Sequence, residues 1–145
     1  MNVCGASYSL IEDELQKHGV CAINTTGNSM RPMLSTNDAV TVKLPDRKLK
    51  KYDVVLYKDS KGRYILHRII GFRGETLIIR GDNTYKKEYV FLDSVLAYMI
   101  SYVKGGKIYD AKRLGYRVYS RFWNFIYPFR RVMRKVKSIL KKKKT

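Results

Sequence analysis

Ser29 is the first residue whose type and surroundings could support chemistry. It lies in the segment GNSMRPML, residues 27–34, between a flexible Gly and the residues Met30 and Pro32. A serine hydroxyl is a weak nucleophile until a neighbouring base takes its proton. A turn rich in Gly, Asn and Ser also needs no chemistry to explain it. The His residues downstream therefore decide whether Ser29 is a nucleophile or only a turn residue.

The chain contains two His residues, and their sequence contexts differ. His18 ends a polar segment, where a basic side chain commonly caps the C-terminus of a helix. His67 lies inside the predicted strand YILHRIIGF, where strand alternation puts it on the side of Ile65 and Ile69. A His between two Ile residues is most often a partly buried structural residue. Its imidazole also titrates near neutral pH, so it is the candidate base for Ser29.

Asp82 is the candidate third member of the site. It lies in RGDN, residues 80–83, at the end of the predicted strand TLIIRG, and a Gly-Asp-Asn triplet usually forms a turn. If that strand neighbours the strand of His67, the Asp82 carboxylate could accept one imidazole N–H and leave the other nitrogen free to act as a base. A carboxylate has this orienting role in Ser-His-Asp systems, and the chain order of the three residues has no physical priority.

Several ordered segments resemble one peptidase superfamily. GNSMRPML is similar to the Ser-Met-x-Pro motif of type I signal peptidases and LexA-like serine peptidases. Asn37 and Asp38, then KKYDVVLYK, LHRIIG and IIRGDN, are similar to its later motifs, and SVLAYMISYV resembles its last core strand. The similarity covers about residues 27–103. One branch of the superfamily has a His in place of the catalytic Lys, and His67 matches that position.

The resemblance implies a role for each residue of the site. Ser29 would be the nucleophile, and His67 would act first as general base and then as general acid. Asp82 would be the orienting acid, and Met30 and Pro32 would shape the turn that presents Ser29. The backbone N–H of Ser29 would be one donor to the oxyanion, the negative oxygen that develops on the attacked carbonyl group.

The chain departs from the family pattern at several positions. Gly27 stands where many signal peptidases have a Ser that assists the oxyanion, so Gly27 and Asn28 belong to the predicted oxyanion turn but the second donor is unassigned. Some His-type members have a further acid after the Gly-Asp-Asn motif. Glu88, six residues past Asp82, is therefore the alternative orienting acid. Tyr52 replaces a Gly that usually precedes the Asp of the third motif, and the usual N-terminal membrane span is absent.

The elements that must position these residues are predicted to be mainly β-strands. Residues 7–18 are expected to form a short helix with a capping box and one apolar stripe. Short strands with short connections favour a strongly coiled antiparallel sheet or a partly closed barrel, in a peptidase domain of residues 1–111. Runs rich in β-branched and aromatic residues, separated by turn clusters, predict strands at residues 20–25, 39–44, 53–58, 64–72, 76–81 and 95–103.

Residues 112–145 form a second predicted unit, a basic amphipathic helical tail. From Leu114 onward apolar residues recur every three or four positions, and Pro128 should kink or split the helix. Thirteen of the 30 Lys and Arg residues follow Asp110, whereas no Asp or Glu does, so the tail carries most of the net charge of +18. The excess positive charge therefore indicates what the tail binds and not what the core binds.

Three arrangements compete for this tail. A basic helix with aromatic residues suits the interface of an anionic membrane, where each charge close to the surface contributes about 1 kcal/mol. The same charges would bind nucleic acid non-specifically, which is the weaker alternative because duplex binding needs no apolar face. The third arrangement is a helix packed on the domain with a solvated basic end. The residues expected to face membrane or phosphate are Arg121, Trp123, Arg130, Arg131 and Lys135.

Cys4 and Cys21 are isolated thiols with no CxxC spacing and no nearby His cluster, so no metal site is expected. The N-terminal segment has no basic region or long apolar run and contains acidic residues, unlike a signal peptide. No window approaches the roughly 18 apolar residues of a membrane span. We therefore expect a cytoplasmic protein with reduced cysteines and no cofactor, bound peripherally to the inner membrane face through its tail.

The sequence thus predicts a serine endopeptidase that cleaves a leader, signal or propeptide, with Ser29 and His67 as its catalytic pair. Two alternatives belong to other classes. One is a LexA-like, DNA-associated regulator that cuts only itself or nothing, and the other is a catalytically silent module that binds a membrane or nucleic acid. The segment before Ser29 is too short for a helix-turn-helix and a linker, which weighs against the regulator.

Overall fold

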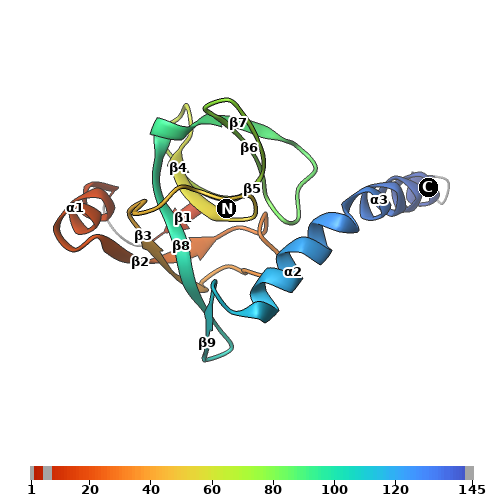
Figure 1. Cartoon of the computed structure of the whole chain (residues 1–145). Helices are drawn as coiled ribbons and strands as arrows, with labels where there is room; N and C mark the ends of the chain where they lie inside the picture. The colour runs from red at the N-terminus through yellow and green to blue at the C-terminus, as the bar shows by residue number, and fades with distance from the viewer. Residues whose placement is uncertain (1, 5–7, 143–145) are drawn as a thin grey trace.

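The computed structural model describes residues 2–4 and 8–142. Short strands joined by tight turns form the body of the protein, and the α-helices lie near its two ends (Figure 1). The helices are α1 Tyr8–His18, the 3-10 helix η1 Leu92–Ser94, α2 Leu114–Phe125 and α3 Tyr127–Lys142. The strands are β1 Asn2–Cys4, β2 Val20–Thr26, β3 Ala39–Lys43, β4 Val54–Lys58, β5 Tyr64–Arg73, β6 Thr76–Arg80, β7 Glu88–Phe91, β8 Val95–Lys104 and β9 Lys107–Asp110.

One antiparallel sheet contains the nine strands of the described residues. Its main path runs β1-β2-β3-β8-β4-β5-β6-β7, and β9 pairs with β8. The prediction of a mainly β, antiparallel fold is therefore confirmed, and the six predicted strands correspond to β2, β3, β4, β5, β6 and β8. The strands that the sequence pattern did not indicate, β1, β7 and β9, have only three or four residues, which is too few to show a clear alternation.

The sheet curls until its first strand meets a strand from its middle (Figure 1). β1 pairs with β2, with Asn2 opposite Thr26, and Asn2 also lies opposite Ile65 of β5. This single pair does not close the sheet into a barrel, because β6 and β7 continue past β5 on the main path. The curl brings the end of β2, which leads to Ser29, close to the middle of β5, which carries His67.

Strands β4 and β5 are buried on both faces, so their two faces contribute to different parts of the core. One face, with Leu66, packs against α1 and against Met30. The other face, with Ile65 and Ile69, packs against the apolar side of β6. His67 shares the face of Ile65 and Ile69, as the alternation of the sequence predicts.

Helix α1 packs against β2 and ends at His18, where Gly19 follows with a φ of 71°. The left-handed φ suits Gly, which commonly ends a helix in this way. The predicted first residue of the helix, Ser7, lies outside the described residues. Cys21 is a free thiol, and the side chain of Cys4 also lies outside the part that the structure describes.

The C-terminal helix is confirmed, and it is divided near the predicted position. α2 ends at Phe125 and α3 begins at Tyr127, so the break lies just before Pro128. α2 packs Tyr116 and Tyr119 against the core, whereas α3 extends away from the sheet (Figure 1). The first half of the predicted tail is therefore packed on the sheet. Among the described residues, no helix has the combined length and apolar character needed to cross a bilayer.

Candidate active site

Ser29 lies in the turn that follows β2. Gly27 has a φ of 91°, a left-handed conformation in which any side chain would be strained. Met30 is fully buried in the core and anchors the far side of the turn, whereas Pro32 is exposed. Ser29 itself is half-buried. The chain therefore holds Ser29 in a turn that is fixed by a glycine on one side and by the core on the other.

His67 lies opposite this turn, in the middle of β5. Its Nε2 atom is 3.2 Å from Ser29 Oγ, which is within hydrogen-bonding distance. The imidazole is only 6% exposed, so it is held firmly by its surroundings. The structure thus brings the two residues together across the curled sheet, in the contact that an activated serine nucleophile requires.

Gly81 lies so close to this pair that a side chain would not fit. A Cβ atom at position 81 would lie 2.6 Å from the carbonyl oxygen of Ser29 and 3.1 Å from both Ser29 Cβ and His67 Nε2. The first of these contacts is with backbone, so the turn itself would have to move. In the sequence Gly81 looks like an ordinary turn residue, and its role depends on this close approach.

The loop after β6 also binds the Ser29 turn directly. The backbone N–H of Asn83 donates to the Ser29 carbonyl oxygen at 2.7 Å, and Asn83 Nδ2 donates to the Asn28 carbonyl oxygen at 3.1 Å. No described residue accepts a hydrogen bond from the backbone N–H of Ser29. That N–H is therefore available to an oxyanion, while the carbonyl side of Ser29 is held in place.

Glu88 is the acid that lies next to the imidazole. Its Oε2 atom is 3.4 Å from His67 Nδ1, the ring nitrogen that does not face Ser29. The Tyr57 hydroxyl donates a hydrogen bond to the same carboxylate oxygen and lies 3.5 Å from His67 Nδ1. The hydrogen bond with His67 lowers the pKa of Glu88 to about 2, so this carboxylate is ionised at neutral pH.

Burial lowers the pKa of His67 below its ordinary value of 6.5, although the neighbouring Glu88 acts in the opposite direction. The imidazole is therefore neutral at neutral pH, which is the state that can accept a proton. Because an ionised Glu88 faces Nδ1, the tautomer with its proton on Nδ1 is favoured. Nε2 is then left as the acceptor for the Ser29 proton.

Asp82, the predicted orienting acid, is bound by Arg68 instead. Arg68 Nε donates to Oδ1 and Nη2 donates to Oδ2, both at 2.7 Å, and both side chains are almost fully buried. The physical reason is strand alternation, which puts Arg68 on the face of β5 opposite to His67. Of the two acids that the sequence leaves open, the structure puts Glu88 beside His67.

Helix α2 completes the surroundings of this buried ion pair. Arg68 Nη1 donates to the hydroxyls of Tyr116 at 3.0 Å and Ser120 at 2.8 Å, and the Tyr119 hydroxyl donates to Asp82 Oδ2 at 3.3 Å. A buried ion pair is stable only when such further hydrogen bonds satisfy its remaining polar atoms. The pair therefore connects α2 with the loop that holds Ser29.

Trp123 and Arg130 were expected to face a membrane or phosphate. Both side chains form contacts within the protein instead. Trp123 Nε1 donates to the Asp82 carbonyl oxygen at 2.9 Å, and Arg130 Nη2 donates to the same oxygen at 3.0 Å. The Arg130 guanidinium also lies 3.6 Å from the centroid of the Trp123 ring. Both side chains therefore belong to the inner side of the helices. The other three residues of that prediction are exposed, namely Arg121, Arg131 and Lys135.

Comparison with protein families and curated proteins finds no relative of this chain. No protein-family model matches the chain, and no curated protein matches it either. In the described part of the chain, no group of three or more His, Cys, Asp or Glu side chains gathers in a way that could hold a metal ion.

Proposed function

We propose that this protein is a serine endopeptidase in which Ser29 attacks the peptide bond. The observation that supports this most directly is the 3.2 Å contact between Ser29 Oγ and His67 Nε2, with Glu88 on the opposite ring nitrogen. A nucleophile, a base and an orienting acid in mutual contact form the arrangement that acyl transfer uses. The resemblance to signal peptidases and LexA-like peptidases favours the same chemistry.

The proposed reaction has two acyl-transfer steps. His67 Nε2 takes the proton of Ser29 Oγ as that oxygen bonds to the substrate carbonyl carbon, and the Ser29 backbone N–H donates to the resulting oxyanion. The protonated His67 then gives its proton to the leaving amine as the C–N bond breaks. In the second step His67 deprotonates a water that attacks the acyl ester, and the proton returns to Ser29 Oγ. Glu88 stabilises the imidazolium in both steps.

The strands around β1 suggest how an extended peptide would bind. Asn2 lies opposite Thr26, three residues before Ser29, and opposite Ile65, two residues before His67. A peptide strand that took or extended this position would run antiparallel to β2 and β5 and bring a carbonyl group toward the catalytic pair. Main-chain hydrogen bonds would then hold the substrate, and shallow pockets would select its side chains.

The proposed substrate class is a leader, signal or propeptide. The resemblance to signal peptidases implies small residues just before the cleaved bond. Peptides that differ only at the residue before the cut therefore test the class, and kcat/KM should be higher with Ala there than with Leu or Phe. Equal rates for all three peptides would contradict selection of small residues but would leave the serine mechanism intact.

An activity-based probe tests the mechanism itself. A fluorophosphonate reacts with serine hydroxyls that are activated by a base, so we expect label on Ser29, located by mass mapping of peptides. The label should be strongly reduced in His67→Ala. Ser60, exposed in the turn between β4 and β5, is the internal control and should stay unlabelled. A folded protein without label on Ser29 would instead be a silent binding module.

Cleavage should persist at mildly acidic pH. Because burial lowers the pKa of His67, the imidazole becomes neutral, as pH rises, before the ordinary value of 6.5 is reached. We therefore expect kcat/KM to increase with pH along an acidic limb whose midpoint lies below 6.5, and then to level off through neutral pH. The pH profile of the wild-type chain with a peptide substrate measures this. A midpoint above neutral pH would contradict it.

Replacing Glu88 by Gln should lower kcat about tenfold or more and move the acidic limb to lower pH. The substitution removes the negative charge that stabilises protonated His67, so the pKa of His67 falls further. The loss in rate should be smaller than for a buried orienting Asp, because the Glu88 side chain is 35% exposed. Both quantities come from pH profiles of the purified variant.

The matched control for this experiment is Glu75→Gln, in the exposed turn between β5 and β6. It removes the same charge from the surface and should leave kcat and the pH profile unchanged. The comparison variant is Asp82→Asn, which keeps the shape of the Arg68 partner. If Asp82→Asn moves the acidic limb and Glu88→Gln does not, then Asp82 is the orienting acid after all.

A further inference from the structure

Helix α2 makes polar contacts with the protein and leaves large apolar side chains exposed on its outer side. The inner face forms hydrogen bonds to Arg68 and Asp82 through Tyr116, Tyr119, Ser120 and Trp123. A helix on a soluble domain normally buries its apolar face and exposes its polar one. The row of exposed apolar side chains on α2 indicates that its outer face has a partner. The outer face carries Leu114, Val118, Phe122 and Phe125, each more than half exposed, beside the exposed cations Arg117 and Arg121.

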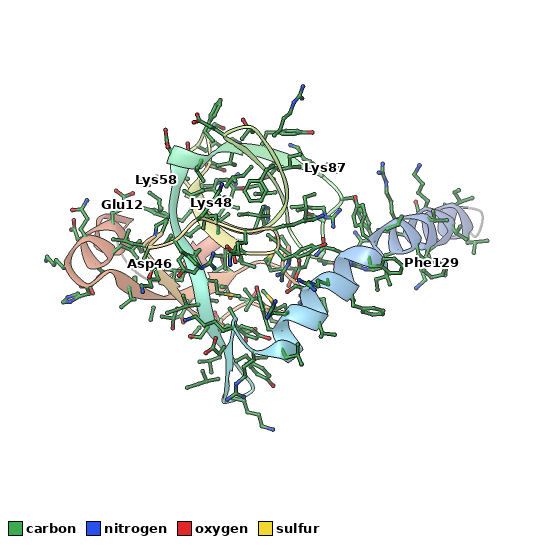
Figure 2. All side chains as sticks on the ribbon, viewed as in Figure 1. Glu12, Asp46, Lys48, Lys58, Lys87 and Phe129 are labelled. Carbon is green, nitrogen blue, oxygen red and sulfur yellow. The ribbon has the colours of Figure 1, made fainter. Side chains whose placement is uncertain are left out.

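Helix α3 continues this exposed apolar face. Ile126, between the two helices, keeps a helical conformation, and the backbone N–H of Arg130 donates to its carbonyl oxygen at 3.0 Å. Phe129, one turn after Phe125, is 69% exposed, and every residue from 131 to 140 is exposed. Figure 2 shows Phe129 near the start of α3 and side chains extending from the helix into open space. We call Leu114, Val118, Phe122, Phe125 and Phe129 the outer stripe.

A basic cleft lies beside the outer stripe. It has a volume of about 990 Å³, and Phe122 and Phe125 form part of its wall. None of its described lining residues is an Asp or Glu. Positive charge gathered in a concave site raises the local concentration of anions. The cations that line it come from three different parts of the chain, namely Lys50 and Lys51, Arg80 and Lys87, and Arg121.

Arg80 is the strongest sign that an anion binds in this cleft. It is only 6% exposed, yet no described carboxylate forms an ion pair with it. Its partners are neutral: Nη2 donates to Asn124 Oδ1 at 2.7 Å, and the guanidinium lies 3.4 Å from the centroid of the Tyr127 ring. Burial lowers the pKa of Arg80, and the charge of Asp82, which is already paired with Arg68, opposes this shift only in part. Buried charges in proteins normally have a partner of opposite charge, and a bound phosphate would be such a partner.

We propose that the outer stripe and the basic cleft together form a docking surface for an anionic phospholipid bilayer. Lipid phosphates occupy the cleft, and the outer stripe lies among the acyl chains just below them. Nucleic acid would use the cations alone and leave the outer stripe in water, so it does not account for both features. Binding through this surface does not depend on peptidase activity, so it can be tested in the Ser29→Ala variant.

Vesicle co-sedimentation with the full chain tests this surface. We expect binding to vesicles made of equal parts phosphatidylcholine and phosphatidylglycerol, and little binding to phosphatidylcholine alone. Replacing Lys50 and Lys51 by Gln should weaken binding about 30-fold, since each basic residue near an anionic surface contributes a factor of about five. Phe122→Ser and Phe125→Ser should each weaken it about tenfold or more, because each removes a large apolar side chain from the bilayer.

Matched variants show whether binding depends on this surface or on positive charge and exposed apolar area anywhere on the protein. Lys17 and Lys61 replaced by Gln remove the same charge from exposed positions elsewhere, and Phe91→Ser removes a Phe with the same 69% exposure as Phe129. These variants should bind vesicles like the wild-type chain, and all variants should keep the wild-type Tm. Equal losses in the control variants would overturn the proposal.

Two further outcomes would also overturn the proposal. One is tight binding of duplex DNA that depends on Lys50 and Lys51 but not on Phe122, without binding to the anionic vesicles. The other is a rise in Tm with inorganic phosphate, abolished by Arg80→Gln, in a chain that does not bind vesicles. The first outcome would identify a nucleic-acid surface, and the second a site for a free anion. Loss of vesicle binding in Arg80→Gln, with Tm retained, would support the bilayer.

Discussion

Replacing Ser29 by Ala should reduce peptide cleavage at least about 1,000-fold and leave the fold intact. The Oγ atom is the one that forms the acyl bond, so no other group can take its place. Its hydrogen bond is with His67, so the loss of the hydroxyl removes little that stabilises the chain. His67→Ala should cause a loss of similar size. Because the two residues act as one unit, the double variant should be no slower than either single variant.

The controls for this experiment come from the same residue types. Ser60 and His18 are exposed, so Ser60→Ala and His18→Ala should cleave at the wild-type rate. Circular dichroism and thermal unfolding report whether each variant is folded. A folded Ser29→Ala chain that keeps more than a few per cent of the wild-type kcat/KM would refute the mechanism, and so would losses that multiply in the double variant.

Replacing Asp82 by Ala should destabilise the folded chain by about 3–5 kcal/mol. The substitution leaves the Arg68 guanidinium, which is 0% exposed, without its anionic partner. The hydroxyls of Tyr116 and Ser120 still accept hydrogen bonds from Arg68, but they cannot neutralise its charge. The free energy of unfolding, measured by urea denaturation and extrapolated to water, gives this loss directly.

Two comparisons make the Asp82 result specific. Glu14→Ala removes an exposed acid that lies 3.9 Å from His18, and it should change stability little. The double variant Arg68→Met, Asp82→Leu should recover much of the unfolding free energy lost in Asp82→Ala. Apolar side chains can replace a buried ion pair without leaving an unpaired charge. Wild-type stability in Asp82→Ala would show that the ion pair with Arg68 does not hold this region together.

The parts of the structure that depend on local pattern could be predicted from the sequence. The apolar runs of β4 and β5 identify strands, and alternation in β5 puts His67 on the face of Ile65 and Ile69. The break between α2 and α3 follows from Pro128, which cannot continue a helix without losing a hydrogen bond. Each of these features is determined by residues that are close together in the chain.

The parts that depend on the meeting of distant residues could not be predicted in the same way. The sequence favours Asp82 as the orienting acid and leaves Glu88 as the alternative, and the choice between them depends on which face of β5 each acid meets. Arg68 was the available signal, since an Arg inside an apolar strand requires a buried anion and Asp82 is that anion. The inner position of Trp123 likewise depends on a carbonyl group 41 residues earlier in the chain.

His67 and Arg68 are consecutive residues of β5 that serve opposite sides of the sheet. If β5 slid past β4 by a single position, Arg68 would turn to the side of Ser29 and His67 to the side of Asp82, so neither side chain would meet its present partner. The hairpin loop formed by Asp59–Arg63 prevents this, because Asp59 N–H donates to the Arg63 carbonyl at 2.9 Å and fixes the loop length. Inserting one residue into that loop should therefore abolish peptide cleavage as completely as Ser29→Ala does.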